Sequence, residues 1–387
     1  MRALLGWLPA LLAALGLSPM NAALQAQSAP DLRPFEARQL GPGIHLLKVS
    51  PDFLAAAISN IGIIKQSDGI VVIDSGATIA HGRRVVDFIR SITDKPVKAV
   101  VITHWHNDHP LGVAAIREAW PRVRVISTVR TRAGLLGPAS TSVGLRPDER
   151  FDTSILNQAY ADAAQMSTLA AGRDVSEEQR ERYQRRARQM IEFGRDFRGT
   201  YLVPPTETFS RELLIDDAER PVRLMFLGRA NTDGDAIAWL PRQRIVMTGD
   251  VVVSPIPFGF FSYPEDWIGV LQRLKALNFT MLVPGHGDPM NDAAYLDRLI
   301  ATIEDIRAQV GPLARQNVPL DQVQSRVDFS AQTAIFGTTP RLRSGFQSLW
   351  LTPMVENAWK EARGIRIYYD PEGETPARAA ERARGRR

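Results

Sequence analysis

Three of the chain's six histidines fall within one six-residue stretch, together with an aspartate. The sequence over residues 103–109 is Thr-His-Trp-His-Asn-Asp-His, directly after a run of apolar residues. In an extended chain, side chains two residues apart point to the same side, so His104 and His106 can converge on one point. Asp108 and His109 follow where the chain must turn, and they can reach a second point nearby. Imidazole and carboxylate groups are ordinary zinc ligands, so this spacing predicts a centre for one or two Zn²⁺ ions.

The absence of cysteine from all 387 residues narrows the chemistry of such a centre. It excludes thiolate ligands, cysteine nucleophiles and disulfides. Two metal ions about 3.5–4 Å apart can share a bridging hydroxide and hold a substrate oxygen, which is the arrangement of many hydrolases. We therefore expect a metal-dependent hydrolase.

The overall composition is that of an ordinary globular protein, with 44% hydrophobic and 23% charged residues. The formal net charge is only +5, and no basic patch is interleaved with aromatic residues. Nucleic acid is therefore not an expected partner, and we expect a small-molecule substrate. The sequence leaves the oligomeric state open.

The N-terminus has the layout of a secretory signal peptide, which we place at residues 1–26. Arg2 gives a positive start, and a mostly apolar run over residues 3–17 is followed by small and polar residues. The run is shorter than the approximately 20 residues that a membrane-spanning helix needs. We expect a periplasmic or secreted protein with no stable membrane anchor after cleavage.

Apolar periodicity predicts an α/β fold in which strands and helices alternate. The expected strands cover residues 44–49, 57–64, 70–73, 97–102, 123–127, 222–226, 236–240, 244–247 and 281–283. The expected helices cover residues 82–92, 266–277, 293–310 and 344–363, and a further helix should follow a capping box at Ser176 and Gln179.

These patterns suggest a division of the chain. The main domain is expected over residues 31–300, with an N-terminal extension over 30–40 and a helical insertion over about 134–198. A C-terminal helical extension over 301–370 and a disordered basic tail over 371–387 complete the expected organisation.

The motif H-x-H-x-D-H and its companions resemble the metallo-β-lactamase superfamily over roughly residues 43–300. The resemblance implies a four-layer αββα sandwich with metals bound at its edge. It matches Asp74 to a strand-end aspartate that supports the site by hydrogen bonding. It matches Asp250 in Thr-Gly-Asp to a carboxylate that bridges both metals, and His286 in Pro-Gly-His-Gly to the last ligand. The implied metal ligands are His104, His106, Asp108, His109, Asp250 and His286.

Asn231 departs from the family pattern, because most relatives have a third histidine at this place. A neutral amide oxygen is a much weaker zinc ligand than an imidazole nitrogen. Three interpretations stay open: two metals of unequal affinity, a single metal at the second position, or an Asn231 amide that donates to the substrate or to a developing oxyanion. The second position, with Asp108, His109, Asp250 and His286, should hold its ion more securely.

The resemblance implies hydrolysis of a lactam, lactone or ester bond by metal-bound hydroxide, with Asp108 orienting the nucleophile. The expected export favours a β-lactamase-like substrate over a cytosolic thioester. The alternatives are a non-haem iron enzyme of sulfur metabolism with the same fold, a phosphodiesterase, and an inactive metal-binding module.

Several other conspicuous residues have both a functional and a structural interpretation. Residues 258–263 contain three phenylalanines and a tyrosine, which either line an apolar pocket wall beside the metals or pack under a loop. Trp105 should point away from the ligands and into the core. His81 is expected at the surface or at a helix cap. Asp233 and Asp235 either support metal-bound histidines or form a turn around Gly234.

Overall fold

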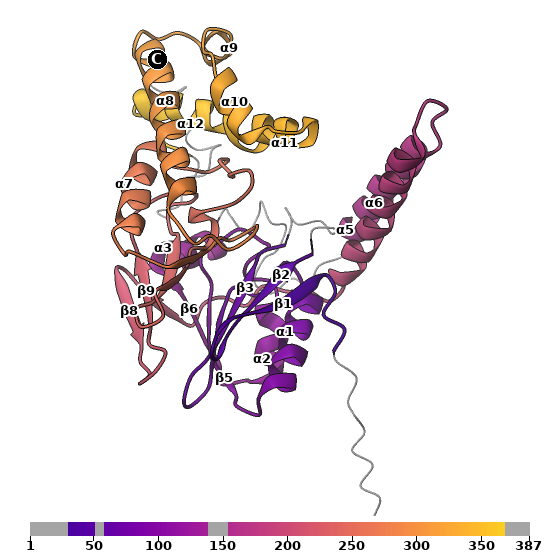
Figure 1. The fold of residues 1–387 in the computed structure, drawn as a ribbon, viewed down its shortest axis with the longest axis vertical. Coiled ribbons are helices and arrows are strands. Elements are labelled where there is room, and N and C mark those ends of the chain that lie inside the picture. The colour runs from indigo at the N-terminus through magenta and orange to yellow at the C-terminus, as the bar shows by residue number, and fades with distance from the viewer. Residues whose placement is uncertain (1–29, 51–57, 138–153, 368–387) are drawn as a thin grey trace, which may run out of the picture.

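The computed structural model describes residues 30–50, 58–137 and 154–367, and within them two β-sheets lie between layers of helices (Figure 1). The expected signal peptide and basic tail lie outside the described residues. No helix among the described residues is both long and apolar enough to cross a membrane.

The larger sheet has seven strands in the order in which they occur along the chain. The pairs from β1 to β4 are antiparallel, and the pairs from β4 to β7 are parallel. Its strands are β1 (Phe35–Gly41), β2 (Ile44–Val49), β3 (Ile61–Lys65), β4 (Ile70–Ile73), β5 (Val97–Val101), β6 (Arg124–Thr128) and β7 (Glu207–Phe209).

The smaller sheet has five strands in the order β12-β11-β10-β9-β8. Only β11 and β12 pair in parallel, so both of their carboxyl ends lie at the same edge. Its strands are β8 (Glu212–Ile215), β9 (Val222–Phe226), β10 (Ala236–Leu240), β11 (Ile245–Met247) and β12 (Met281–Val283).

Side-chain alternation along the buried strands produces three apolar cores and hence four layers. In β4, Ile70 and Val72 pack towards the helices beside the larger sheet, whereas Val71 and Ile73 belong to the core between the two sheets. In the smaller sheet, Ala238 belongs to the core between the sheets, while its neighbours along β10 pack towards the other helical layer. The expected αββα sandwich is confirmed.

Helices of the first half of the chain cover the larger sheet, and helices of the second half cover the smaller one. The first set contains α1 (Ile79–Ile92) and α2 (Val113–Ala119), and α3 (Val129–Leu136) follows β6. The second set contains α7 (Pro264–Lys275), α8 (Ala294–Arg315) and α12 (Thr352–Ala362). The short helices α9 (Leu320–Gln324), α10 (Ser330–Phe336) and α11 (Pro340–Gly345) and the π-helical turn η3 (Phe346–Leu351) join α8 to α12.

Between α3 and β7 the chain forms a helical hairpin of α5 (Ser154–Ala170) and α6 (Glu177–Asp196), which projects away from the sandwich (Figure 1). The capping box is confirmed: Gln179 N donates to Ser176 Oγ at 3.2 Å, and Ser176 N donates to Gln179 Oε1 at 3.0 Å.

One expectation was wrong, and another was right only in part. Residues 35–41 are not a simple extension, because they form β1 and pair with β2 along its whole length. His81 lies at the helix cap, which is one of its two expected places: its N donates to Thr78 Oγ1 at 3.1 Å, and its Nδ1 accepts from Ala77 N at 3.2 Å. It is not at the surface, because its side chain is fully buried and its ring lies 5.4 Å from that of Phe35. The apolar neighbours of His81 come from β1 and α6, which its local sequence does not reveal.

Candidate metal centre

The predicted ligands meet at one edge of the sandwich because each follows the carboxyl end of a strand. The histidine-rich loop follows β5, Asp250 lies in the 3₁₀ turn η2 (Gly249–Val251) after β11, and His286 follows β12. Main-chain hydrogen bonds join these edges, with Ala236 N donating to Thr103 O at 2.8 Å and Gly285 N to Gly249 O at 2.9 Å. The edge is therefore held by backbone contacts as well as by side chains.

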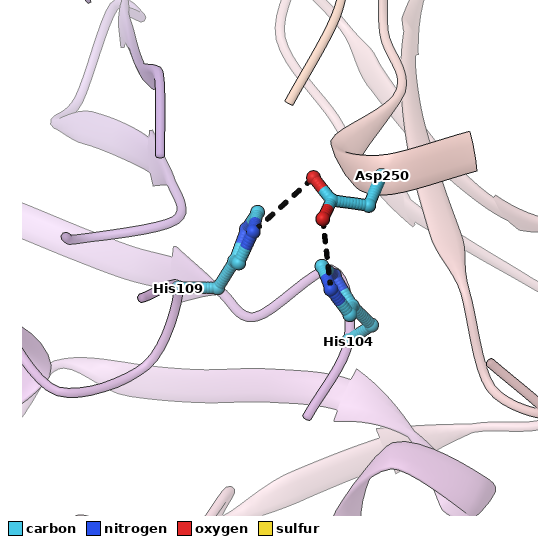
Figure 2. Close-up of side chains that lie close together, drawn as sticks. All are labelled: His104, His109 and Asp250. Carbon is cyan, nitrogen blue, oxygen red and sulfur yellow. Dashed lines mark ion pairs between the residues drawn. The ribbon is translucent and has the colours of Figure 1, made fainter. Parts of the chain in front are cut away.

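The first group of donor atoms consists of His104 Nε2, His106 Nδ1 and Asp250 Oδ2. The two ring nitrogens lie 2.8 Å apart, and the carboxylate oxygen lies 3.6 Å from His104 Nε2 and 3.8 Å from His106 Nδ1. Figure 2 shows how Asp250 faces His104 with one oxygen and His109 with the other.

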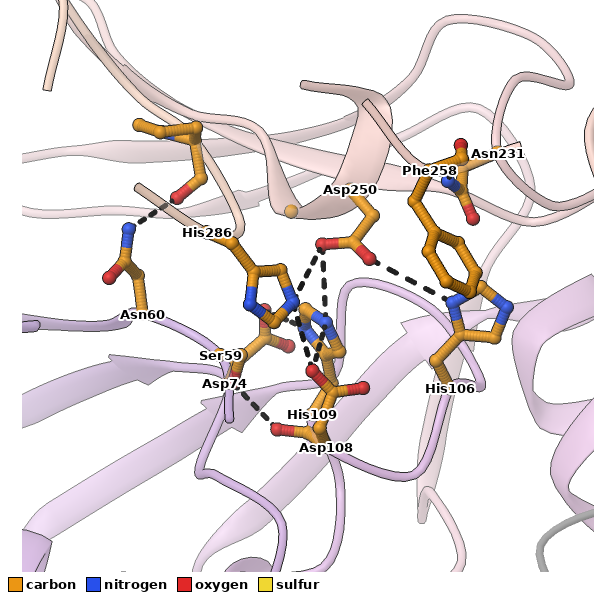
Figure 3. Close-up of polar contacts among 12 residues, drawn as sticks. Ser59, Asn60, Asp74, His106, Asp108, His109, Asn231, Asp250, Phe258 and His286 are labelled. Atoms are coloured by element: carbon orange, nitrogen blue, oxygen red, sulfur yellow. Dashed lines mark hydrogen bonds and ion pairs between the residues drawn. The ribbon is translucent and has the colours of Figure 1, made fainter. Parts of the chain in front are cut away.

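The second group consists of Asp108 Oδ2, His109 Nε2, His286 Nε2 and Asp250 Oδ1. His109 Nε2 lies 3.3 Å from Asp250 Oδ1 and 3.5 Å from Asp108 Oδ2. His286 Nε2 lies 2.9 Å from Asp108 Oδ2 and 3.5 Å from Asp250 Oδ1. The two oxygens of Asp250 thus belong to different groups, and this single carboxylate joins them (Figure 3).

These donor groups fit divalent cations. Ligand atoms arranged tetrahedrally at about 2.0–2.1 Å from a zinc ion lie about 3.3 Å apart, and the distances above fall around that value. The donors are also buried: His104 and His109 are fully buried, and the exposed fraction of His106, Asp250 and His286 is 8% or less. Buried carboxylates and imidazoles at such separations require a compensating charge, which a cation supplies. The residues present therefore fit the implied metal.

The electrostatics of the side chains alone lead to the same conclusion. Burial would lower the pKa of His109, but Asp108, Asp74 and Asp250 outweigh it and hold this pKa well above its usual value. For His286, burial is likewise outweighed by Asp250 and Asp108, which raise the pKa to about 9. Burial and the neighbouring His109 lower the pKa of His104 to about 3. Without metal, the second group therefore retains protons where a cation would bind.

This proton uptake predicts opposite pH responses for metal binding and for the metal-free protein. To coordinate a cation, His286 would have to lose its proton, so metal affinity should rise with pH up to about 9. The pKa of His286 is about 6.5 in an unfolded chain, so its contribution to metal-free stability is full below pH 6.5 and is lost towards pH 9. Dissociation constants and thermal midpoints at several pH values between 6 and 9 would test both. His286→Ala should flatten both slopes, and unchanged slopes would contradict the assignment.

Asp74 supports the second group from behind the ligands. Its Oδ1 accepts a hydrogen bond from Thr103 N at 2.9 Å. Its Oδ2 accepts from Thr103 Oγ1 at 2.9 Å and lies 2.8 Å from His109 Nδ1. This contact directs His109 Nε2 towards the donor group, which is the usual role of a carboxylate behind a metal-binding histidine.

Asp74→Asn should weaken metal binding without removing a ligand. The amide has one acceptor oxygen instead of two, so it cannot satisfy both Thr103 and His109. Loss of such a supporting contact typically lowers metal affinity by about 10–100-fold. A competition titration with a chromophoric chelator would measure this change. Asp87→Asn, at an exposed position on α1, is the matched control. Equal affinities for both variants would refute the role of Asp74.

Two polar residues that were not predicted from the sequence fix the loops. Ser59 Oγ donates to Asp108 O at 2.7 Å. Asn60 Nδ2 donates at 2.9 Å to Pro284 O and at 2.9 Å to Gly287 O, so it holds the loop that carries His286 (Figure 3). Their only signal in the sequence is their position, because Ser59 and Asn60 are a polar pair directly before an apolar strand. Gly285 is also required, because a Cβ atom there would overlap Asp250 Oδ1.

The structure places Asn231 at the His106 side of Asp250, beside Phe258 (Figure 3). Its side chain is fully buried, and its Nδ2 donates to Phe258 O at 2.8 Å. Its Oδ1 is buried and has no hydrogen-bond partner among the described residues. The side chain therefore has an unused hydrogen-bond acceptor, Oδ1, whereas its Nδ2 already donates to Phe258 O.

Asp233 and Asp235 are both almost fully buried beside this loop. Asp235 Oδ2 accepts from Thr232 N at 2.6 Å, and burial raises the pKa of Asp235 to about 8. Asp233 Oδ2 lies 3.7 Å from Arg130 Nη1. Asp235 therefore supports the turn that carries Asn231, whereas the carboxyl group of Asp233 faces Arg130 on α3.

Comparison with known proteins places these observations in a family context. The family model of the metallo-beta-lactamase superfamily matches residues 55–286. The linear primary-alkylsulfatase of Pseudomonas sp. (strain ATCC 19151) is 24% identical over 304 residues, which are 73% of this chain and 52% of that protein. The chain thus spans about half the length of the curated relative it matches.

A solved structure with a TM-score above 0.5 shows the same fold. A double mutant of the sec-alkyl sulfatase PisA1 has a TM-score of 0.54 at 14% identity, and the match covers 90% of this chain and 54% of that chain. A metallo-beta-lactamase from Pontibacter korlensis has a TM-score of 0.49 at 17% identity, with 70% of this chain and 99% of that chain covered.

Proposed function

The chain belongs to the metallo-β-lactamase superfamily, and from that premise we propose that it is a zinc-dependent hydrolase of ester or lactam bonds. One observation carries the proposal: the two oxygens of Asp250 face separate groups of imidazole nitrogens at 3.3–3.8 Å. A donor set of four imidazoles and two carboxylates, without a thiolate, suits zinc.

Bound zinc would polarise the scissile bond and lower the pKa of a water molecule towards about 7. The protein residues would hold the ion and position the attacking water beside it. His109 and His286 are held against Asp108 and Asp250 by the contacts described above. The carboxylate of Asp108 has a lowered pKa: burial opposes this, but His109 and His286 dominate. Asp108 is therefore ionised at neutral pH and can orient the attacking water by accepting its hydrogen bond.

Asn231 contributes through its oxygen in this proposal. One amide hydrogen bond goes to Phe258 O, which fixes the side-chain orientation and leaves Oδ1 free to face the first donor group. An amide oxygen is a weak ligand, so we propose two metal ions of unequal affinity. The second group, with two carboxylates and two imidazoles, is the tighter one.

A sulfate ester of an apolar alcohol is the first substrate class to test. The 24% identity to a linear primary-alkylsulfatase extends over 73% of this chain and supports this choice. Carboxylic esters, lactones and β-lactams are the second class, supported by the superfamily match and by the same donor geometry. We also propose that the protein is exported, on the basis of the apolar N-terminal run.

A substrate panel with chelation and metal add-back tests the proposal. Purified protein would be assayed with decyl sulfate, 4-nitrophenyl butyrate, a γ-lactone, nitrocefin and bis(4-nitrophenyl) phosphate. We expect turnover of at least one of the first four to be lost on chelation and restored by zinc. Restoration only by iron would indicate the non-haem iron alternative, and turnover of the diester alone a phosphodiesterase. No metal-dependent turnover in the panel would favour a metal-binding module and overturn the proposal.

A further inference from the structure

Three phenylalanines extend from the first donor group to the surface. The ring centroid of Phe258 lies 5.4 Å from that of His106, and the two rings meet edge to face. Phe261 lies 5.6 Å from His106 and 5.1 Å from Trp105. Phe260 lies 4.9 Å from Phe258 and is 41% exposed. Together, Phe258, Phe260 and Phe261 form an apolar surface, here called the aromatic wall.

The C-terminal helices hold the loop that carries this wall. Asn357 of α12 is buried, and its Nδ2 donates to Gly259 O at 2.9 Å, to Phe260 O at 3.2 Å and to Ser262 Oγ at 3.3 Å. From η3, Leu349 O accepts a hydrogen bond from Gly259 N at 2.9 Å. Four polar contacts from a distant part of the sequence therefore fix Gly259, Phe260 and Ser262 of this loop.

Packing reinforces these hydrogen bonds. A Cβ atom at Gly259 would lie 2.8 Å from Met354 Cγ and 3.2 Å from Trp350 Cε3, so the helices press directly against the loop backbone. Trp350 in turn packs edge to face on Trp267 of α7, with ring centroids 5.2 Å apart. The loop thus lies between a rigid helical layer on one side and His106 on the other.

The other side of the loop is tied to the metal centre. Phe258 O accepts the amide of Asn231, and Tyr263 N donates to Ala230 O at 2.9 Å. A shift of the loop would therefore move both the aromatic wall and Asn231, which lies beside the first donor group. Small-molecule sites usually combine apolar and aromatic side chains with a few precisely placed polar groups, and both kinds of group meet beside His106.

We propose that the aromatic wall binds the apolar substituent of the substrate beside the reacting bond, and that Asn357 is the positioning residue that holds it there. This inference rests on the proposed function for the location of the reacting bond. It assigns a task to the C-terminal helices: they determine substrate selectivity at a centre to which they contribute no ligand.

Equilibrium binding of non-hydrolysable sulfonates separates this inference from the hydrolase proposal. Decane-1-sulfonate and ethane-1-sulfonate have the same charged group but differ in chain length. Calorimetric titration of the zinc-loaded wild-type protein should show at least tenfold tighter binding of the longer compound, since each buried CH₂ contributes to affinity. Turnover is not needed, so failure of the substrate panel and failure of this test are distinct results.

Two variants probe the wall and its support. Phe260→Ala removes an exposed ring and should lower the ratio of long-chain to short-chain affinity at least threefold. Asn357→Asp keeps the side-chain size but turns a carboxylate towards the acceptors, so it should lower the same ratio with Phe260 still present. Metal content, measured in parallel, should stay unchanged in Phe260→Ala. Leu214→Ala on β8 and Asn291→Asp, both at exposed positions, are the matched controls.

The outcomes are decisive even if Asn357→Asp does not fold, because Phe260→Ala alters only an exposed side chain. A ratio that falls in Phe260→Ala but not in Leu214→Ala supports the wall. A folded Asn357→Asp with a wild-type ratio overturns the positioning role. Equal affinities of wild-type protein for both sulfonates, or a wild-type ratio in Phe260→Ala, overturn the proposal as a whole.

Discussion

Asp250→Asn is expected to remove most of the bound metal and to lower the hydrolysis rate by at least about 10³-fold, which corresponds to about 4 kcal/mol of transition-state stabilisation. Among the described residues, only Asp250 has side-chain oxygens that face both donor groups. The asparagine keeps the shape but removes the negative charge that lies among four imidazoles. Both groups should therefore lose affinity at once.

Elemental analysis after dialysis at a fixed free zinc concentration would measure the metal, and initial rates with the best substrate of the panel would measure activity. Asp87→Asn is again the matched control, because it makes the same chemical change at an exposed position. Circular dichroism would verify folding. If the variant retained two tightly bound ions, Asp250 would not join the two groups.

Asn231→His is expected to act in the opposite direction and to raise the affinity for the weaker ion by at least about tenfold, because imidazole is a far better zinc ligand than an amide. The tighter ion, held by Asp108, His109, His286 and Asp250, should be unaffected. The imidazole can also donate a hydrogen bond to Phe258 O, as the amide does in the wild-type protein.

Zinc binding at graded free zinc concentrations would show two steps in the wild-type protein and closer or merged steps in the variant. Asn231→Gln controls for added bulk in a fully buried position, since it enlarges the side chain but keeps the amide. Equal and tight binding of two ions in both the wild-type protein and Asn231→His would contradict the idea of a weakened first position. A gain in Asn231→Gln as large as in Asn231→His would attribute the effect to size.

The effect expected of Asn231→His and the aromatic wall have a common structural origin. Asn231 binds the main chain of Phe258, and Phe258 packs on His106, so the first donor group and the proposed substrate contacts share one loop. The loop is held from outside by Asn357. Changes at the first donor group are therefore expected to alter selectivity as well as rate.

Much of the fold was predictable because its signals are local. The strand over residues 44–49 and the strand over 236–240 have the predicted bounds, since short apolar runs between turn residues leave few alternatives. Helix boundaries were less accurate: α1 begins at Ile79, capped by Thr78, whereas periodicity alone suggested a start at residue 82. The cap is a hydrogen bond of one side chain, which apolar spacing does not record.

Elements whose partners are distant in sequence were not predictable. Strand β1 is mostly exposed and polar, so only its pairing with β2 defines it. The burial of His81 depends on Phe35 and on Phe193 of α6, which approach from either side. The role of Asn60 depends on carbonyl groups more than 200 residues away.

By itself, the sequence determined which chemical groups are available and their order: a histidine-rich loop, a carboxylate and a last histidine, each after a buried strand. Spacing within one loop even indicated that His104 and His106 share a point, because backbone geometry fixes the directions of nearby side chains. Only the tertiary structure decided that the ligands form two donor groups, with one Asp250 oxygen facing each group. It also decided which helices hold the loop of the aromatic wall beside these groups. Such contacts form between segments that strand pairing and layer packing bring together, and no local pattern encodes those distances.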